Sequence, residues 1–266
     1  MNPRPTTPEV TVRPDERTTA RTLVDALLEQ VADREDPHVG LTGGSMGVEV
    51  AREIGARWAT DETAAALLDR THWWFSDERF LPEGHADRND TQVLEALGTR
   101  PAPERWHVLA PAPGDDPSRD EAEAAAVDQA AELAMVPRHE GLPSLDLLVL
   151  GVGPDCHVAS LFPGHPDSAV HDRWTTAVDD SPKPPPVRVS FTMPVIRAAE
   201  QVWLVACGEG KAEALAGARE AFAGCASTTV AARAGEPLDR PAGWAQGRTA
   251  TRWFLDEAAA ARLPAA

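Results

Sequence analysis

The stretch SLDLLVLGVGPDCHVASLFPG, residues 144–164, decides the fold. Its first half is an apolar run that ends at Leu150 and is bounded by glycine and proline, which is typical of a buried strand. Directly after this run the chain turns and presents Asp155, Cys156 and His157. Because ligands of open α/β sheets bind at the carboxyl ends of strands, the stretch predicts both a core strand and a functional site.

Short apolar runs alternate with longer amphipathic runs on both sides of this strand. This alternation predicts an α/β fold, with a mostly parallel sheet flanked by helices. The proline-rich residues 179–188, DDSPKPPPVR, cannot form a helix, and we expect a long surface loop there. We expect further strands at 38–42, 72–76, 106–110, 201–208 and 250–256, and helices at 19–34, 46–58, 88–97, 119–135, 194–200 and 211–222.

Composition limits the class of protein. The formal net charge of −17 argues against nucleic acid or an anionic membrane as a partner. No apolar run approaches the ~20 residues that span a bilayer, and the N-terminus has no apolar signal core. Three cysteines without metal spacing favour a reduced, cytoplasmic protein. We expect a flexible N-terminal segment, residues 1–12, and a single α/β domain, residues 13–266. Only two of the 25 cationic residues are lysines, Lys183 and Lys211.

A glycine turn follows the strand expected at 38–42. Gly43 and Gly44 turn the chain, and Ser45 stands at the N-cap of the next helix, where free backbone N–H groups bind anions. The same residues are also consistent with a purely structural turn and cap. Gly43, Ser45 and Gly47 match the G-x-S-x-G elbow of serine hydrolases as well. That alternative is weaker, because little chain precedes Ser45 to complete an oxyanion hole.

Charged residues recur at other strand ends. HWWFSDERF, residues 72–80, delivers Asp77 and Arg79 at the end of a strand, and Arg188 begins a short strand. Lys211 lies in the first turn of an expected helix, where a cation opposes the helix dipole and a bound anion would offset the cost. Taken one at a time, each of these residues also fits an exposed surface charge. Together they predict an anion site at one edge of the sheet.

His157 adds a candidate general base to this anion site. An unperturbed histidine has a pKa near 6.5 and accepts a proton at cytoplasmic pH. The sequence therefore predicts a phosphate pocket beside a base. Asp155, Cys156 and His157 are too close together in the chain for a normal metal site, so we expect no metal there. The glycines around Gly151 and Lys211 lack the spacing of nucleotide-binding loops.

Five segments of the chain carry family motifs: LTGGSMG (41–47), WWFSDERFLPEGHADRND (73–90), LGVGPDCHVASLFPG (150–164), RVSFTMPVIRAAEQVWLVACGEGK (188–211) and ATRWFLDEAAAARL (250–263). In these segments the chain resembles the 6-phosphogluconolactonases, and the resemblance covers nearly the whole chain, from about residue 20 to residue 263. The related glucosamine-6-phosphate deaminases carry Asn-Glu-Pro where this chain has Leu161, Phe162 and Pro163.

The resemblance implies a fold and an activity. The fold is a Rossmann-like, mostly parallel sheet flanked by helices, with a small subdomain. The activity is hydrolysis of 6-phospho-D-glucono-1,5-lactone to 6-phosphogluconate, the second step of the pentose phosphate pathway, without metal or organic cofactor. We expect a cytoplasmic monomer whose partner is a sugar phosphate lactone. A glucosamine-6-phosphate deaminase-like enzyme and a catalytically weak sugar-phosphate sensor remain the alternatives.

The resemblance also implies roles for individual residues. His157 matches the catalytic histidine that activates water, and Asp77 and Asp155 match acidic positions near it, one of which orients the imidazole. The remaining matches concern binding of the substrate and its phosphate: Gly43, Gly44, Ser45, Arg79, Asn89, Arg188 and Lys211.

The chain departs from the family pattern in three places, which involve four residues. Met46 and Gly47 stand where Thr-Pro is usual, and Arg88 stands where Ser is usual. Cys156 replaces a glycine, which predicts a tight turn with positive φ. Its thiol is either a small buried side chain or a reactive group activated by His157.

Overall fold

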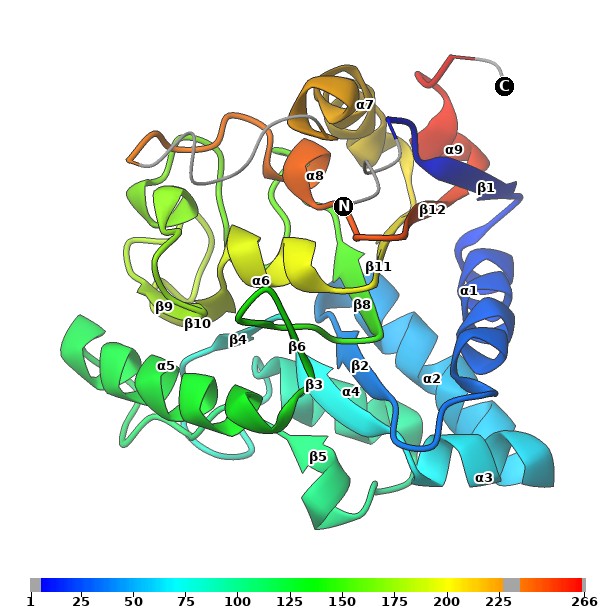
Figure 1. Ribbon diagram of the computed structural model, residues 1–266, viewed down its shortest axis with the longest axis horizontal. Helices are drawn as coiled ribbons and strands as arrows, with labels where there is room; N and C mark the ends of the chain where they lie inside the picture. Colours follow the sequence, from blue (N-terminus) through cyan, green and yellow to red (C-terminus); the bar gives the residue numbers. More distant parts are fainter. Residues whose placement is uncertain (1–5, 227–234, 265–266) are drawn as a thin grey trace.

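The structure is a computed structural model that describes residues 6–226 and 235–264. Within these residues, seven parallel strands form the central sheet, in the order β1-β12-β11-β8-β2-β3-β5 (Figure 1). The predicted α/β fold with a parallel sheet is therefore confirmed. The strands are β1 Glu9–Arg13, β2 His38–Leu41, β3 His72–Phe75, β5 Trp106–His107, β8 Leu147–Gly151, β11 Gln201–Ala206 and β12 Ala250–Asp256.

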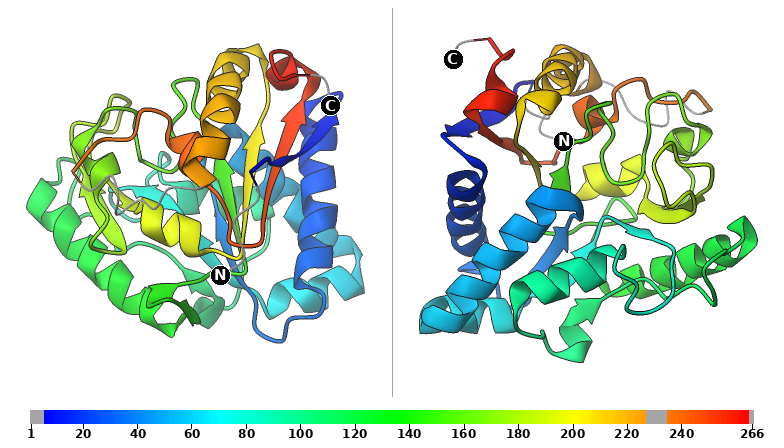
Figure 2. Two further views of the ribbon diagram at one scale, coloured as in Figure 1. Left: turned by 45° about the horizontal axis from the view of Figure 1, so that its top comes forward. Right: turned by 180° about the vertical axis from the view of Figure 1, so that it is seen from behind.

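Helices cover both faces of this sheet (Figure 2). Strand β8 shows why two cores form. Leu147 and Val149 point into one apolar cluster and Leu148 and Leu150 into the other, as the period of two in a strand requires. The first cluster lies under α1 Glu16–Val31, α2 Gly44–Thr60, α3 Glu62–Asp69 and α4 Asn89–Leu97; the second lies under α6 Met193–Ala198, α7 Ala212–Ala226, α8 Pro241–Trp244 and α9 Glu257–Ala260.

A small antiparallel sheet forms the subdomain that the resemblance implies. Its strand order is β4-β10-β9, and α5 Arg119–Glu132 packs against it through alanines such as Ala122 and Ala126. The proline-rich loop joins β9 to β10 and contains no helix, as predicted. The strands are β4 Asp77–Arg79, β9 Thr175–Val178 and β10 Arg188–Phe191, with a separate short hairpin of β6 Arg138–His139 and β7 Leu142–Pro143.

The N-terminal boundary differs from the prediction. Strand β1 pairs in parallel with β12 from Glu9 to Arg13 and forms one edge of the central sheet. Residues 9–12, which we expected in a flexible segment, are therefore part of the fold. The alternating sequence EVTVR fits a strand at a sheet edge, but it is too short to stand out among the prolines that surround it.

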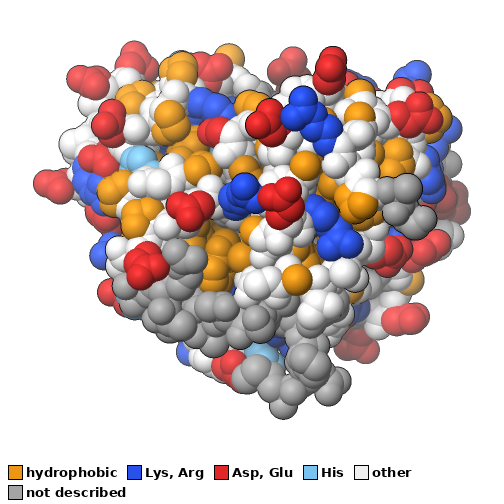
Figure 3. Space-filling model, turned by 90° about the horizontal axis from the view of Figure 1, so that it is seen from above, with side chains coloured by type: hydrophobic (Ala, Val, Ile, Leu, Met, Phe, Trp, Pro, Cys, Tyr) orange, Lys and Arg blue, Asp and Glu red, His pale blue; other side chains and the backbone are white. Residues whose placement is uncertain are grey.

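The surface reflects the acidic composition. Acidic side chains stand around the rim of the face seen from above, and Lys and Arg side chains lie among them (Figure 3). Among the helices of residues 6–226 and 235–264, none combines the length and apolar character that crossing a membrane requires.

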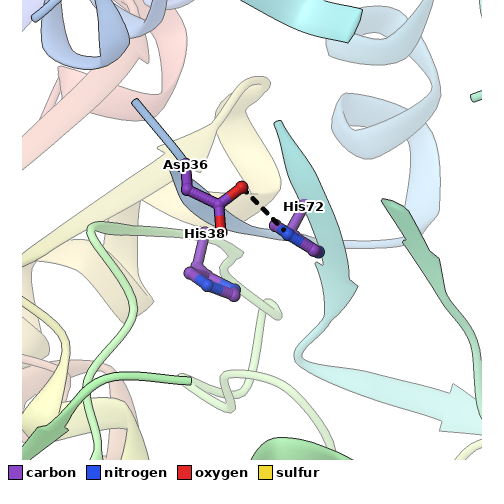
Figure 4. A group of neighbouring side chains, drawn as sticks. All are labelled: Asp36, His38 and His72. Carbon is purple, nitrogen blue, oxygen red and sulfur yellow. Dashed lines mark ion pairs between the residues drawn. The ribbon is translucent and has the colours of Figure 1, made fainter. Parts of the chain in front are cut away.

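Histidines begin two adjacent strands at the edge of the sheet opposite the carboxyl ends. His38 and His72 are the first residues of β2 and β3, and their rings stack with centroids 4.5 Å apart and planes 11° apart (Figure 4). Asp36 Oδ1 lies 3.2 Å from His72 Nε2, and Arg105 also pairs with Asp36. Because imidazole lone pairs lie in the ring plane, these parallel stacked rings cannot both coordinate one ion. His38 and His72 are instead buried polar side chains of the sheet, and Asp36 lies exposed beside them.

This histidine pair makes folding stability sensitive to acid. Burial, helped by the neighbouring His72, lowers the pKa of His38 to about 4, and burial also lowers the pKa of His72. The unfolded chain therefore binds a proton more tightly than the folded one. The stabilising contribution is complete above pH ~6.5 and is lost as the pH falls toward about 4. We expect His38 alone to account for a loss on the order of 3 kcal/mol over this range.

Urea unfolding between about pH 7 and about pH 4.5 measures this effect. His38→Asn keeps an acceptor for Trp74 Nε1, which donates to His38 Nδ1 at 3.1 Å, but removes the titrating group. The free energy of unfolding of this variant should fall less steeply with acid than that of the wild type. His139→Asn, at a half-buried position on β6, is the control. Equal slopes in the wild type and His38→Asn would rule out the assignment.

Candidate active site

A cavity of about 280 Å³ lies at the carboxyl ends of β2, β3, β8 and β11, where ligands were expected. Four cationic side chains and one carboxylate are among the residues that line it, so the pocket is locally positive in an acidic protein. Nine of the predicted site residues line the cavity: Gly43, Gly44, Ser45, Asp77, Arg79, Asn89, His157, Arg188 and Lys211. The tenth, Asp155, contacts His157 from outside the lining.

Asp155 is the acid that contacts the imidazole. Its Oδ1 atom lies 2.5 Å from His157 Nδ1, whereas Asp77 makes no such bond among those found in the described residues. A carboxylate accepts hydrogen bonds, so Nδ1 carries the proton and Nε2 keeps its lone pair. The ring of Phe162 packs against the imidazole at 4.6 Å between centroids. These contacts fix both the tautomer and the orientation of His157.

The imidazole lies directly over a glycine. A Cβ atom built on Gly153 would lie 2.0 Å from His157 Nδ1 and 2.4 Å from Asp155 Oδ1. Such distances are far below van der Waals contact, so any side chain at this position displaces the His157–Asp155 pair. Gly153 is therefore required because His157 and Asp155 lie too close to leave room for a side chain.

Asp77 has a different environment. It is buried at the end of the β3–β4 connection and accepts hydrogen bonds from Ser76 Oγ at 3.1 Å and Ser160 Oγ at 2.7 Å. Its charge also acts on Arg188, whose pKa is lowered by burial and raised in turn by Asp77. Asp77 thus connects the loop after His157, through Ser160, with Arg188 on the cationic side of the pocket.

The glycine turn forms one wall of the pocket, with one correction to the prediction. Helix α2 begins at Gly44, so its N-cap is Gly43, not Ser45, and Gly44 itself has a φ of +76°. No side chain caps the helix, so its first-turn N–H groups remain available to an anion. Gly47 packs closely on the preceding strand: a Cβ atom there would lie 2.1 Å from the Thr42 carbonyl oxygen.

Arg79 and Arg188 lie directly opposite each other on β4 and β10. Arg79 Nη1 donates to the Asp87 carbonyl at 2.7 Å. Arg188 is buried and donates to the carbonyls of residues 183–185 at 3.0 to 3.3 Å, which anchors the proline-rich loop. Like charges in a cross-strand pair repel each other, so an anion between them is favourable.

Lys211 reaches the pocket from the other side. It is the last residue of the short 3-10 turn Glu209–Lys211 and precedes α7, rather than lying in the helix as predicted. Burial, followed by the charge of Lys183, lowers the pKa of Lys211. Both effects are relieved when a bound anion supplies negative charge.

Asn89 offers the pocket an unused acceptor. The side chain is buried; its Nδ2 donates to the Asp77 carbonyl at 2.9 Å, but its Oδ1 has no hydrogen-bond partner. An unpaired buried acceptor is costly, and a ligand hydroxyl in the cavity would satisfy it. Asn89 Oδ1 also explains why residue 43 is a glycine, because a Cβ atom there would lie 1.8 Å from this oxygen.

Arg88, which departs from the family pattern, is a buried anchor rather than a ligand of the pocket. Its guanidinium binds both carboxylate oxygens of Asp90, at 2.9 and 2.8 Å, and the carbonyls of Leu81 and Leu109. Bidentate pairs of this kind are strong and geometrically specific. Arg88 thereby fixes the start of α4, and with it Asn89.

Lys183 is the functional candidate that the sequence analysis missed. It lines the cavity, and its Nζ lies 3.3 Å from Asp155 Oδ1 and 3.2 Å from His157 Nδ1. The available signal was its rarity: it is one of two lysines in the chain, and the other, Lys211, had already been assigned to the site.

The predicted backbone at Cys156 is confirmed, and the reactive-thiol hypothesis is wrong. Cys156 has a φ of +76°. Its side chain is buried in the core that includes α7, with Sγ 3.5 Å from the Ala214 carbonyl. Burial raises the pKa of the thiol to about 11, so the reactive thiolate is scarce at neutral pH.

Two substitutions of Cys156 separate backbone strain from packing. Cys156→Ala loses the sulfur but keeps a side chain at positive φ, whereas Cys156→Gly relieves the strain. We expect the glycine variant to be more stable than the alanine variant by about 1 kcal/mol. Chemical denaturation measures the difference, and both variants should retain activity. An alanine variant at least as stable as the glycine variant would show that the turn carries no strain.

Comparison with known proteins agrees with the fold. The family model described as glucosamine-6-phosphate isomerases/6-phosphogluconolactonase matches residues 15–253. A 6-phosphogluconolactonase of Streptomyces coelicolor is 43% identical over 265 residues, covering 97% of this chain and 95% of the relative. One of Rattus norvegicus is 40% identical over 230 residues, covering 85% and 80%. The solved structure of the Trypanosoma brucei 6-phosphogluconolactonase matches with a TM-score of 0.80 at 21% identity, over 97% of this chain and 99% of that one.

The parallel sheet, its helices and the small antiparallel sheet define a protein of the glucosamine-6-phosphate isomerase/6-phosphogluconolactonase superfamily. Within that superfamily, the chain belongs to the 6-phosphogluconolactonase family.

Proposed function

We propose that this enzyme hydrolyses 6-phospho-D-glucono-1,5-lactone to 6-phosphogluconate, with a water molecule activated by His157. Family membership supports the substrate, since relatives that are 43% and 40% identical are 6-phosphogluconolactonases. One observation carries the mechanism: a single cavity holds a histidine with a free Nε2 beside a cluster of cationic side chains. A lactone phosphate needs a base at one end and an anion site at the other.

The reaction requires one base and one positioned water. His157 Nε2 removes a proton from water as the water oxygen bonds to the lactone carbonyl carbon, and the carbonyl electrons move onto oxygen. When this tetrahedral intermediate collapses, the bond between the carbonyl carbon and the ring oxygen breaks. The imidazolium returns its proton to the leaving ring oxygen, and the new carboxylic acid loses a proton to water. Asp155 holds the imidazole throughout.

The phosphate anchors the substrate at the other end of the pocket. Arg79, Lys211 and the first-turn N–H groups of α2 supply the charge, and Arg188 and Asp77 frame that wall. Asn89 Oδ1 accepts a hydrogen bond from a sugar hydroxyl. Because this binding energy acts far from the reacting carbonyl, it orients the lactone rather than strengthening the bond to be broken.

Removing either phosphate-binding cation should discriminate between phosphorylated and unphosphorylated lactones. A charge-assisted contact contributes about 1.5–3 kcal/mol, so Arg79→Met and Lys211→Met should each raise KM for the phosphorylated lactone roughly 10- to 150-fold. Both variants should hydrolyse glucono-1,5-lactone, which lacks the phosphate, at nearly the wild-type rate. Initial rates corrected for spontaneous hydrolysis measure both.

Arg17→Met, an exposed position on α1, is the matched control for loss of one positive charge. Equal losses on both lactones would mean that Arg79 and Lys211 serve the chemistry or the fold instead. Ammonia release from glucosamine 6-phosphate would support the deaminase alternative. Binding of phosphogluconate without turnover of the lactone would support the sensor.

We further propose that the enzyme acts in the cytoplasm as a monomer. The residues that the mechanism uses line or border one cavity within a single chain, so the proposed site does not need a second subunit, and Cys156, Cys207 and Cys225 form no disulfide in the described part of the chain. Size-exclusion chromatography with light scattering tests the oligomeric state.

A further inference from the structure

A lysine ammonium lies against the catalytic pair. Lys183 Nζ and His157 Nδ1 both approach one atom, Asp155 Oδ1, at 3.3 and 2.5 Å, and lie 3.2 Å from each other. The shortest of these contacts joins the imidazole to the carboxylate, so Nδ1–H and the ammonium both donate to that oxygen. One carboxylate thus faces two groups that can carry positive charge.

The backbone that carries Lys183 is held firmly. Ser181 Oγ accepts from the Lys183 N–H at 3.3 Å and donates to its carbonyl at 2.9 Å. Arg188 Nη2 donates to the same carbonyl at 3.0 Å. Prolines on both sides, Pro182 and Pro184, restrict φ. The loop therefore presents one lysine to the catalytic pair.

We propose that Lys183 is a positioning residue: its ammonium balances the charge of Asp155 and so keeps the imidazole of His157 neutral, with Nε2 free to accept a proton from water. This inference rests on the proposed function, in which His157 is the base. It assigns the proline-rich loop a part in the chemistry and gives Arg188 the role of holding that loop in place.

Electrostatics gives the reason. A carboxylate alone beside an imidazole favours the imidazolium, which cannot act as a base. A cation on the same carboxylate oxygen cancels much of that attraction and repels a second positive charge. Beyond Asp155 and Lys183, four charged groups line the pocket that His157 faces: Asp77, Arg79, Arg188 and Lys211. Among the described residues, Lys183 is the only cation of the pocket with a hydrogen bond to the pair of His157 and Asp155.

The titration behaviour of the neighbours is consistent with this arrangement. Although burial opposes it, the hydrogen bond with His157 and the charge of Lys183 help to hold the pKa of Asp155 well below its usual range. Burial and the charge of Lys183 lower the pKa of Lys211, whereas Asp155 acts against this shift. The charge of Lys183 therefore lowers the pKa of both Asp155 and Lys211.

The test is the pH dependence of kcat/KM, which reports groups of the free enzyme. Lys183→Met should move the acid limb of the profile to higher pH by about one unit. This is the shift expected when a unit positive charge 3.2 Å away, screened by water, is removed. At pH values above the limb, its kcat/KM should stay within a few-fold of wild type. Lys183→Arg, which keeps the charge, should restore the wild-type limb, and Arg17→Met should leave it unmoved.

A second readout does not depend on activity. The imidazole resonance of His157, assigned by its absence in His157→Asn, should titrate about one unit higher in Lys183→Met than in wild type. If the acid limb and the His157 resonance do not move but the plateau of kcat/KM falls, Lys183 is a substrate contact. If nothing changes, Lys183 has no part in catalysis. Either result overturns the inference. If activity and its acid limb survive in His157→Asn, the base assignment itself fails, which is a distinct outcome.

Discussion

His157→Asn should lower kcat by about 100-fold or more, the scale expected for loss of a general base. Asparagine places an N–H near the position of Nδ1, so the hydrogen bond to Asp155 can survive while the free Nε2 is lost. Rates on fresh lactone, corrected for spontaneous hydrolysis, measure the loss. Binding of 6-phosphogluconate should persist, because the cations that hold the phosphate are untouched.

Calorimetric titration with 6-phosphogluconate is the control for this variant. Lost turnover with unchanged product affinity locates the defect in the chemistry. Near-normal turnover in a folded His157→Asn protein would contradict the mechanism and leave the serine-hydrolase alternative open. In that event a covalent adduct on Ser45, sought by mass spectrometry, would decide the matter.

Gly153→Ala should be almost as damaging as removal of the base, although it deletes no functional group. The new Cβ atom would lie 2.0 Å from His157 Nδ1, so the imidazole must move by about an ångström or more. A misplacement of that size costs on the order of 100-fold in rate. Gly153 does not have positive φ, so alanine introduces no backbone strain and the protein should fold.

Gly114→Ala is the matched control, since a Cβ atom at Gly114 meets nothing within 4 Å. It should leave both kcat and stability near wild type. In Gly153→Ala, the affinity for 6-phosphogluconate should fall far less than kcat, because a Cβ atom at Gly153 would meet His157 and Asp155 and not Arg79 or Lys211. Wild-type turnover in Gly153→Ala would mean that the position of the imidazole matters little.

The central sheet and much of the site could be predicted because their patterns are local. Apolar runs such as Leu147–Leu150 specify a strand without reference to the rest of the chain. Parallel strands bring their carboxyl ends to one edge, so His157, Asp77 and Lys211 could be placed together from their positions after strands. The positive φ at Cys156 followed from the glycine expected there.

What the sequence did not predict depends on contacts between distant segments. The N-cap of α2 is Gly43 rather than Ser45, in a turn where Gly44 has positive φ, and such a turn leaves no periodic signal in the sequence. Lys183 comes within 3.2 Å of His157 only because a hairpin of the small subdomain folds over the sheet edge. The anchoring role of Arg88 was not predicted because its carbonyl partners, at Leu81 and Leu109, have no sequence signature.

Under the proposed function, the arginines that face each other across β4 and β10 connect the stability of the folded chain to ligand binding, and we expect a bound sugar phosphate to stabilise the enzyme. Opposed like charges cost free energy in the empty protein, and an anion held between them removes that cost. A ligand that binds only the folded chain stabilises it by about 2.7 kcal/mol when its concentration is a hundred times Kd. Proteases that attack unfolded chains would therefore clear this enzyme fastest when sugar phosphates run low. Under the proposed function, the small antiparallel sheet would thereby make the amount of folded enzyme depend on the supply of its substrate.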